Sequence, residues 1–153
     1  MQNVSLAGVL DPQTIKTHLQ ANNKDEVIKT IAKMFFDAGY VKNVDDFVEA
    51  VYDREKQGVT GIGHHVAIPH GKSATVQQNG VAIVTLDHEI DWESLDDTGA
   101  KVIVLFAVGD DSEGAKEHLK MLAMFAKKLA KPNVIKQLLA ADDVNDVMQI
   151  FGE

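Results

Sequence analysis

Seven consecutive apolar residues, Val102–Val108 (V-I-V-L-F-A-V), constrain the fold more than any other segment of this chain. A half-exposed strand alternates apolar and polar residues, whereas a strand covered on both faces is apolar throughout. The run therefore predicts a central strand with a layer of structure on each side of its sheet. Because segments with helical periodicity lie on both sides of this run in the sequence, we expect helices to form both layers, which is an α/β fold.

Three further segments have the patterns of strands. Val66–Ile68 and Val81–Leu86 are short apolar runs, and Thr14–Ala21 alternates in part, which favours a strand at the edge of the sheet. The order of strands and helices is not a regular βαβ alternation. We therefore expect a mixed β-sheet flanked by helices on both faces.

Polar capping residues mark the first two helices. Asn23, with Glu26 three residues later, predicts the start of a helix that ends near Gly39. Asn43 predicts the start of a second helix, and Gly58 its end. The expected buried faces of these helices comprise Val27, Ile31, Met34 and Phe35 in the first and Phe47, Val48 and Val51 in the second.

The C-terminal third is expected to be helical. Ser112 is the predicted N-cap of a long helix that Pro132 ends. Its apolar stripe is expected to comprise Leu119, Leu122, Phe125, Ala126 and Leu129. Two short helices, Val134–Ala140 and Val144–Phe151, are predicted to complete the chain.

The composition restricts the class of protein. The 153 residues include no low-complexity linker, which predicts a single domain over residues 1–153. The absence of cysteine excludes disulfides and cysteine nucleophiles. No apolar run approaches the ~20 residues that span a bilayer, and the first residues lack the basic and apolar regions of a signal peptide. We therefore expect a cytoplasmic protein without direct membrane insertion.

The net charge of −8 and the presence of a single arginine, Arg54, argue against nucleic-acid binding. Such binding needs clustered basic side chains that displace counterions from phosphates. An acidic surface suits a basic protein partner, although the same charge also serves solubility alone.

His70 is the first candidate for chemistry, because it lies between Pro69 and Gly71 directly after the apolar run Val66–Ile68. Proline cannot donate to a sheet ladder, so strand pairing is expected to stop there, and glycine lets the backbone turn away. The histidine would then lie at the rim of the sheet. A neutral imidazole has a free lone pair and is a competent nucleophile toward phosphorus. The alternative is an ordinary surface histidine in a turn.

Two other residues could assist His70. Arg54 is expected near the end of the second helix, just before the loop that leads to His70, where its planar fork could hold a phosphoryl group. His118 shares a helix face with Met121, Leu122 and Phe125, so it could donate a hydrogen bond to that group or select one tautomer of His70. Each also has a structural alternative: an arginine over the core paired to an acidic neighbour, and a histidine bonded to a backbone carbonyl.

The remaining histidines are weaker candidates for catalysis or metal binding. His64 and His65 are adjacent, so on an extended segment they would face opposite ways and could not chelate together. His18 and His88 are expected on the surface, and no H-x-x-x-H or H-E-x-x-H spacing occurs. We therefore expect no metal site.

Two further motifs are more simply explained as loops. Gly71-Lys72-Ser73 resembles the end of a P-loop, but Val66 stands where that loop needs glycine and Pro69 removes an amide. The acidic residues around Trp92, which are Asp91, Glu93, Asp96 and Asp97, fit a solvated loop better than a carboxylate pair for acid–base chemistry.

The block from Arg54 to Lys72, R-E-x-x-G-x-T-G-I-G-x-x-V-A-I-P-H-G-K, resembles the active-site signature of enzyme IIA domains of the fructose/mannitol family. These domains belong to the phosphoenolpyruvate-dependent sugar phosphotransferase system (PTS). The D-W-E-S-L-D segment, the strand V-I-V-L-F-A-V and the helix E-H-L-K-M-L follow in the order the family has. The resemblance covers nearly the whole chain, although the N-terminal third matches only loosely.

The resemblance implies a mixed sheet flanked by helices and a phosphocarrier function in sugar uptake. It implies that His70 is transiently phosphorylated and that Arg54 and His118 surround the phosphoryl group. The donor would be HPr, a small basic phosphocarrier, and the acceptor a cysteine of an enzyme IIB. Because this chain has no cysteine, we expect IIB on a separate chain, with the membrane enzyme IIC involved only indirectly. No cofactor or metal is implied.

This chain departs from the family at two places. Relatives often have Asn-Gly where His64-His65 stands, and proline in the loop where this chain has G-D-D-S-E-G-A-K (residues 109–116). Two other functions remain open. A regulatory, nitrogen-type enzyme IIA would use the phosphorylation state of His70 to control protein binding, and Trp92 weakly favours the sugar branch over it. A histidine-based metalloprotein is the third alternative.

Overall fold

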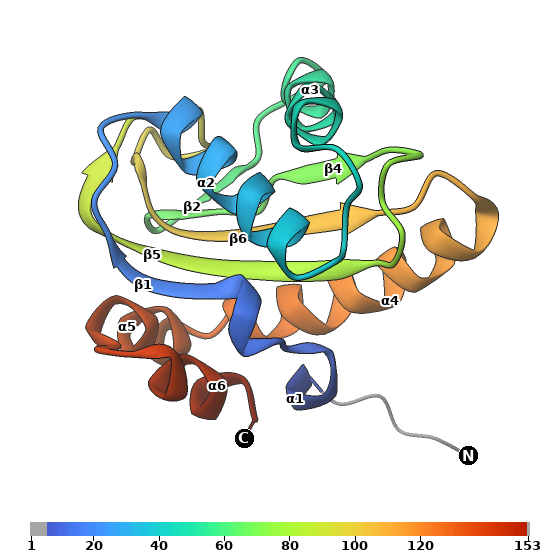
Figure 1. The fold of residues 1–153 in the computed structure, drawn as a ribbon. Coiled ribbons are helices and arrows are strands. Elements are labelled where there is room, and N and C mark those ends of the chain that lie inside the picture. Colours follow the sequence, from blue (N-terminus) through green and yellow to red (C-terminus); the bar gives the residue numbers. More distant parts are fainter. Residues whose placement is uncertain (1–5, 153) are drawn as a thin grey trace.

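A mixed β-sheet forms the centre of the computed structural model, which describes residues 6–152 and the side chains of residues 8–152 (Figure 1). The sequence predicts no signal peptide at the start of the chain, where residues 1–5 lie outside the described part. The strands are β1 (Ile15–Leu19), β2 (Gly61–Gly63), β3 (Val66–Ala67), β4 (His70–Lys72), β5 (Gly80–Ile90) and β6 (Ala100–Val108).

The strand order is β1-β5-β6-β3-β2, and β4 pairs with β6 beyond the end of β3. β5 and β6 are antiparallel, whereas β1 pairs with β5, and β3 and β4 pair with β6, in parallel. The predicted mixed sheet is therefore confirmed. The predicted edge position of β1 and the central position of β6 are confirmed as well.

Helices cover both faces of the sheet. They are α1 (Leu6–Val9), α2 (Lys24–Asp37), α3 (Val44–Glu55), α4 (Ser112–Leu129), α5 (Pro132–Ala140) and α6 (Val144–Gly152), with a short 3₁₀ helix at Pro12–Thr14. Figure 1 shows α2 and α3 on one face and α4, α5 and α6 on the other. None of the helices in the described part of the chain combines the length and apolarity needed to cross a bilayer.

The side chains of β6 alternate between two hydrophobic cores, as a strand covered on both faces must. Val102, Val104, Phe106 and Val108 pack with apolar residues of α4, α5 and α6. Ile103, Leu105 and Ala107 pack with apolar residues of α2 and α3.

The predicted caps of the first two helices are confirmed. Asn23 accepts a hydrogen bond from the amide of Glu26 (2.9 Å), and Asn43 accepts one from the amide of Asp46 (2.9 Å). α3 ends at Glu55, three residues before Gly58.

Three expectations for the C-terminal third were wrong in detail. Asp111, not Ser112, caps α4, by accepting from the amide of Gly114. Pro132 does not end α4, which stops at Leu129, but begins α5, where its missing amide is harmless. Leu119 is 65% exposed, because Met121, Phe125 and Leu129 form the buried stripe and Leu119 lies on the opposite side of the helix.

The segment around His70 differs from the prediction in one respect. β3 ends at Ala67, as expected before a proline, but pairing with β6 resumes at His70, which lies beside Phe106. The carbonyl of Pro69 accepts a hydrogen bond from the amide of Phe106 (3.0 Å). The proline therefore takes part in the pairing with β6 as an acceptor, although it has no N–H to donate. His70 therefore lies within a sheet strand rather than beyond the end of the sheet.

Candidate active site

His70 lies on β4 with its ring against the ring of Phe106 in the neighbouring strand. The ring centroids are 5.6 Å apart and the planes are inclined by 20°, which is a stacked arrangement. Phe106 also contacts Phe125 of α4 edge to face (5.5 Å). The His70 ring thus packs on Phe106, which in turn packs on Phe125 on the α4 side of the sheet.

Gly71 lets α3 lie directly on the other side of β4. A Cβ atom at Gly71 would lie 2.6 Å from Cε1 of Phe47 and 2.9 Å from Cγ2 of Val51, closer than real Cβ atoms approach. The sequence assigned Gly71 to a turn, which was wrong, because it is a strand residue that permits close packing. The close packing carries the last turn of α3, with Arg54, to the end of β4.

The structure brings the three predicted site residues together at one pocket of about 460 Å³. His70 comes from β4, Arg54 from the last turn of α3 and His118 from α4. The lining comprises Ala50, Asp53, Arg54, Gln57, His70, Lys72, Val108, His118 and Leu122. Two helices from opposite faces of the sheet therefore meet at the carboxyl ends of β4 and β6.

Burial keeps the His70 imidazole neutral. Burial, followed by the nearby His118 and Arg54, lowers the pKa of His70 from 6.5 to about 4. Burial, followed by the charge of Lys72, lowers the pKa of His118 as well. Both rings are therefore neutral at pH 7, and each has one nitrogen that can accept a hydrogen bond or attack an electrophile.

Three ring nitrogens at this pocket are buried and make no hydrogen bond to any described residue. They are Nδ1 and Nε2 of His70 and Nδ1 of His118. Buried polar atoms without partners are rare in folded proteins and costly, so they call for an explanation such as a catalytic role. An anionic group bound in this pocket would provide one.

Arg54 makes one hydrogen bond among the described residues, from Nη1 to the carbonyl oxygen of Gly58 (3.2 Å). The structural alternative, an arginine paired to an acidic neighbour such as Asp53 or Glu49, does not occur among the described residues. The Asp53 carboxylate lies near Lys56 instead (3.8 Å). The rest of the guanidinium fork remains available to an anion.

Lys72 also lines the pocket, which the sequence patterns did not predict. Lys72 follows His70 by two positions on β4, so the two side chains lie on the same face of the strand. The spacing was visible in the sequence, but Lys72 was considered only as part of an incomplete P-loop. It adds a second cation to the site.

The adjacent histidines, His64 and His65, form the turn between β2 and β3 rather than an extended segment, which corrects the prediction. Both have positive φ angles, 56° and 68°, as the two central residues of a type I′ hairpin turn require. Asp96 accepts from the amide of His64 (3.0 Å), and the His65 ring pairs with Glu89. An Asn-Gly pair, which is typical of type I′ turns, would adopt the same backbone with less strain.

The other candidate ligands lie on the surface or stabilise a loop. His18 pairs with Asp87 (3.1 Å), and His88 is exposed. Asp96 accepts hydrogen bonds within its own loop, from Thr98 and Ser94, so it has a structural role. Within residues 8–152, no three histidine or carboxylate side chains are close enough to share a metal ion.

The model of one protein family, "Phosphoenolpyruvate-dependent sugar phosphotransferase system, EIIA 2", matches residues 8–153. The chain belongs to this family. The enzyme IIA resemblance that the Arg54–Lys72 block predicts is therefore confirmed, and the chain is a component of a phosphotransferase system.

Relatives with different names match this enzyme IIA chain at similar levels. A mannitol-specific phosphotransferase enzyme IIA component of Halalkalibacterium halodurans is 28% identical over 95% of each chain. A fructose-specific EIIABC component of Bacillus subtilis is 30% identical over 98% of this chain, which spans only 23% of that protein's length. A nitrogen regulatory protein of Bradyrhizobium diazoefficiens is 29% identical over 96% of this chain and 94% of its own.

Solved structures share the fold. The nitrogen regulatory protein IIA-Ntr from Neisseria meningitidis superimposes with a TM-score of 0.85 at 24% identity, over 95% of this chain and 98% of its own. The mannitol enzyme IIA of Escherichia coli, in complex with phosphorylated enzyme IIB, superimposes with a TM-score of 0.77 at 23% identity, over 93% and 96%. The predicted enzyme IIA fold is therefore confirmed.

Proposed function

We propose that this enzyme IIA is a sugar-transport phosphocarrier in which His70 accepts a phosphoryl group from phospho-HPr and passes it to a cysteine of an enzyme IIB. One observation carries the proposal. A neutral imidazole with buried, unpartnered nitrogens lies in the same pocket as Arg54, Lys72 and His118. A neutral nucleophile surrounded by cations and hydrogen-bonding groups is what transfer of an anionic group requires.

In the forward step, a ring nitrogen of His70 attacks the phosphorus carried by HPr. The family resemblance assigns this role to Nε2. The new N–P bond forms as the N–P bond of the donor breaks, and the electron pair of that bond stays with the histidine of HPr. His70 keeps the proton on its other nitrogen, so no base is needed to activate it. The transfer as proposed uses no metal or nucleotide.

Arg54 and Lys72 would stabilise the equatorial oxygens as negative charge spreads over them in the transition state. His118 would donate a hydrogen bond to the same group or hold His70 in one tautomer. Since the protein's contribution to phosphoryl transfer is mainly positioning and charge stabilisation, these roles need no movement of the sheet.

The acceptor would be an enzyme IIB outside these 153 residues, because they contain no cysteine. The solved complex of the E. coli mannitol enzyme IIA with phosphorylated IIB supports this partner. A membrane enzyme IIC would take part only through IIB, and an exchange with phospho-HPr would place the chain in the cytoplasm.

The direct test is incubation with phosphoenolpyruvate, enzyme I and HPr, followed by intact mass measurement. We expect one acid-labile phosphoryl adduct in the wild type and none in His70→Ala. A cognate enzyme IIB should then remove the adduct. Equal labelling of wild type and His70→Ala would refute the assignment of His70.

A second candidate is a regulatory enzyme IIA, in which phosphorylated and unphosphorylated His70 select different protein partners and no sugar is phosphorylated. The identity to the nitrogen regulatory protein of B. diazoefficiens, 29% against 28% for the mannitol component of H. halodurans, favours neither branch. An adduct that no enzyme IIB of the same organism removes would support the regulatory function. The third alternative, a histidine-based metalloprotein, is tested by metal analysis of the purified protein.

A further inference from the structure

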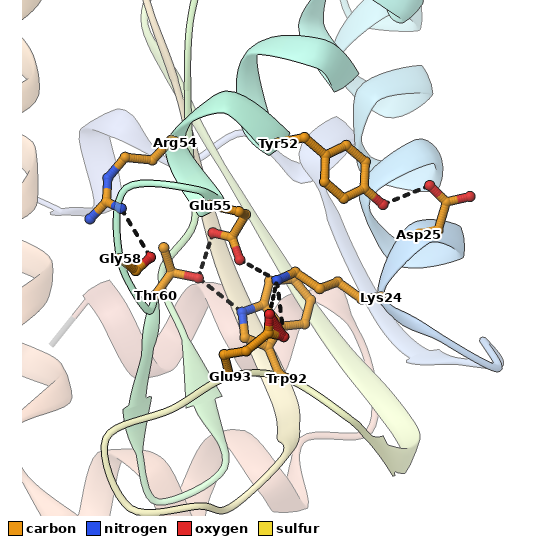
Figure 2. A network of polar contacts seen from close by, with 9 residues as sticks. All are labelled: Lys24, Asp25, Tyr52, Arg54, Glu55, Gly58, Thr60, Trp92 and Glu93. Carbon is orange, nitrogen blue, oxygen red and sulfur yellow. Dashed lines mark hydrogen bonds and ion pairs between the residues drawn. The ribbon is translucent and has the colours of Figure 1, made fainter.

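A chain of buried polar contacts surrounds Glu55, the neighbour of Arg54 at the end of α3 (Figure 2). The Glu55 side chain is only 7% exposed and forms an ion pair with Lys24. It also accepts a hydrogen bond from Oγ1 of Thr60 (2.7 Å). The same Thr60 oxygen accepts a hydrogen bond from Nε1 of Trp92 (2.9 Å). The carboxylate is thus held from two directions.

These contacts join the last turn of α3 to two distant parts of the fold. Lys24 is the first residue of α2, and its ammonium lies 4.7 Å from the centre of the Trp92 ring in the β5–β6 loop. One turn earlier on α3, the hydroxyl of Tyr52 donates to Asp25 of α2 (2.6 Å), as Figure 2 also shows. The end of α3 is therefore fixed relative to both α2 and the β5–β6 loop.

The same contacts fix the acceptor of the Arg54 guanidinium. Arg54 donates to the carbonyl of Gly58, which lies in the loop between Glu55 and Thr60. Because the Glu55 carboxylate holds the hydroxyl of Thr60, both ends of this short loop are tied together. The Gly58 carbonyl, and with it the direction of the Arg54 side chain, then has little freedom.

Lys24 also determines which cation Glu55 neutralises. The Glu55 carboxylate is paired with Lys24, and no carboxylate of residues 8–152 lies within ion-pair distance of Arg54. A carboxylate that paired with Arg54 would compete with a bound phosphoryl group for the same fork. The arrangement leaves Arg54 charged and available.

Stability alone does not account for this network, because desolvating a carboxylate and an ammonium often costs as much as their attraction returns. We propose that Glu55 is a positioning residue that, through Thr60 and the Gly58 carbonyl, holds Arg54 in the direction needed for phosphoryl transfer. The loss of phosphoryl-transfer rate expected on changing Glu55 rests on the proposed function. The structural consequence for Arg54 can be measured without any phosphoryl donor.

The structural consequence is measured by ¹⁵N NMR of the Arg54 side chain. Arg54 is the only arginine in the sequence, so its Nε–H group gives a single resonance. We expect the Glu55→Gln variant to shift or broaden this resonance and to lower its heteronuclear NOE. The matched control, Glu49→Gln, replaces an exposed carboxylate on the same helix and should leave the resonance unchanged.

The kinetic consequence is measured with phospho-HPr as donor. We expect Glu55→Gln to lower kcat by between about 10- and 100-fold with little change in KM, because a displaced guanidinium fails in the transition state while HPr still docks. In an Arg54→Ala background, adding Glu55→Gln should cause almost no further loss, since the residue it positions is absent. Thr60→Val, which replaces only the hydroxyl by a methyl group, should likewise lower kcat in the wild type and cause almost no further loss in the Arg54→Ala background.

The outcomes separate this inference from the proposed function. An equal loss of rate with and without Arg54, or an unchanged Arg54 resonance in a folded Glu55→Gln protein, would show that Glu55 has only a structural role. If Glu55→Gln does not fold, Thr60→Val decides by the same two measurements. If phospho-HPr fails to label the wild type, the proposed function is refuted. If the wild type is labelled but Glu55→Gln changes neither the transfer rate nor the Arg54 resonance, only this inference is refuted.

Discussion

The rings of His70 and His118 meet edge to face, with centroids 4.7 Å apart and planes at 88°. Both rings also contact Phe106, so each imidazole is desolvated by the other and by the same phenyl ring. Protonating either one would place a charge in this apolar contact. Packing, through desolvation, therefore favours the neutral state of both rings.

We expect the ring protons of His70 to titrate with a midpoint near the pKa of about 4 that burial, His118 and Arg54 produce. The measurement is ¹H NMR of the ring Cε1–H as a function of pH, with His70→Gln to assign the signal. A midpoint near 6.5, the ordinary value for histidine, would show that water reaches the ring freely.

The lowered pKa of His70 also predicts a pH dependence of stability. Between pH 6.5 and about 4 the unfolded chain binds a proton at this position and the folded chain does not, so stability falls as the pH falls through this range. The effect is absent above 6.5 and complete below about 4. It amounts to about 3 kcal/mol, and the lowered pKa of His118 acts in the same direction.

Urea unfolding of wild type and His70→Gln at about pH 7.5 and about pH 4.5 checks this linkage. The free energy of unfolding of the wild type should fall more between the two conditions than that of the variant, because glutamine does not titrate. Equal losses would mean that groups other than His70, such as His118, dominate the loss of stability between these two pH values.

Arg54→Ala is expected to slow phosphoryl transfer from phospho-HPr to His70 by about 10²-fold or more, because one charge partner of the transition state is lost. Arg54→Lys should recover only part of the rate, since lysine lacks the planar fork. Single-turnover quench kinetics measure both. Lys56→Ala, which removes an exposed cation two residues along, serves as the control, and the assignment fails if it is as slow as Arg54→Ala.

The local patterns of the sequence predicted single elements well and contacts between elements poorly. The apolar run of β6 and the caps Asn23 and Asn43 depend on the segment that contains them, so they were visible in the sequence. The pairing of His70 with Phe106 and the packing of Gly71 under Phe47 join segments far apart in the chain. Nothing local signals them, and Gly71 was therefore assigned to a turn.

The candidate site also combines residues that local sequence patterns reveal with residues that only the fold brings together. His70 and Arg54 stand in one continuous motif, and the helical spacing of His118 with Met121 and Phe125 marked it as a candidate before the family resemblance implied its place beside the phosphoryl group. Lys72 was missed although it shares a strand face with His70, because the strand was expected to end at Pro69. The buried state of Glu55 depends on Lys24 and Trp92, which lie 31 residues before and 37 residues after it in the numbering, and no periodicity connects them.

Lys72→Met should slow phosphoryl transfer by about tenfold, since the ammonium adds to the charge that Arg54 provides and the methionine keeps most of the side chain's volume. The same change should raise the pKa of His118, because Lys72 helps to lower it. Kinetics and the His118 titration test the two effects independently. Lys72→Arg should restore both, and a rate insensitive to charge at this position would exclude Lys72 from the site.

Gly71→Ala should destabilise the protein by about 1–3 kcal/mol, because the new methyl group overlaps the Phe47 ring and Val51 and α3 must move off the sheet. Since α3 carries Arg54, phosphoryl transfer should also slow, even under conditions where the variant is fully folded. Gly109→Ala is the control, because its Cβ would meet only atoms at ordinary contact distance (3.6 Å or more). Phe47→Leu should restore part of both losses in the Gly71→Ala background by making room for the methyl group. Urea unfolding and single-turnover kinetics measure both effects in the wild type, Gly71→Ala, Gly109→Ala and the Gly71→Ala/Phe47→Leu double variant. A stable Gly71→Ala with normal transfer would mean that α3 does not depend on this close approach to place Arg54.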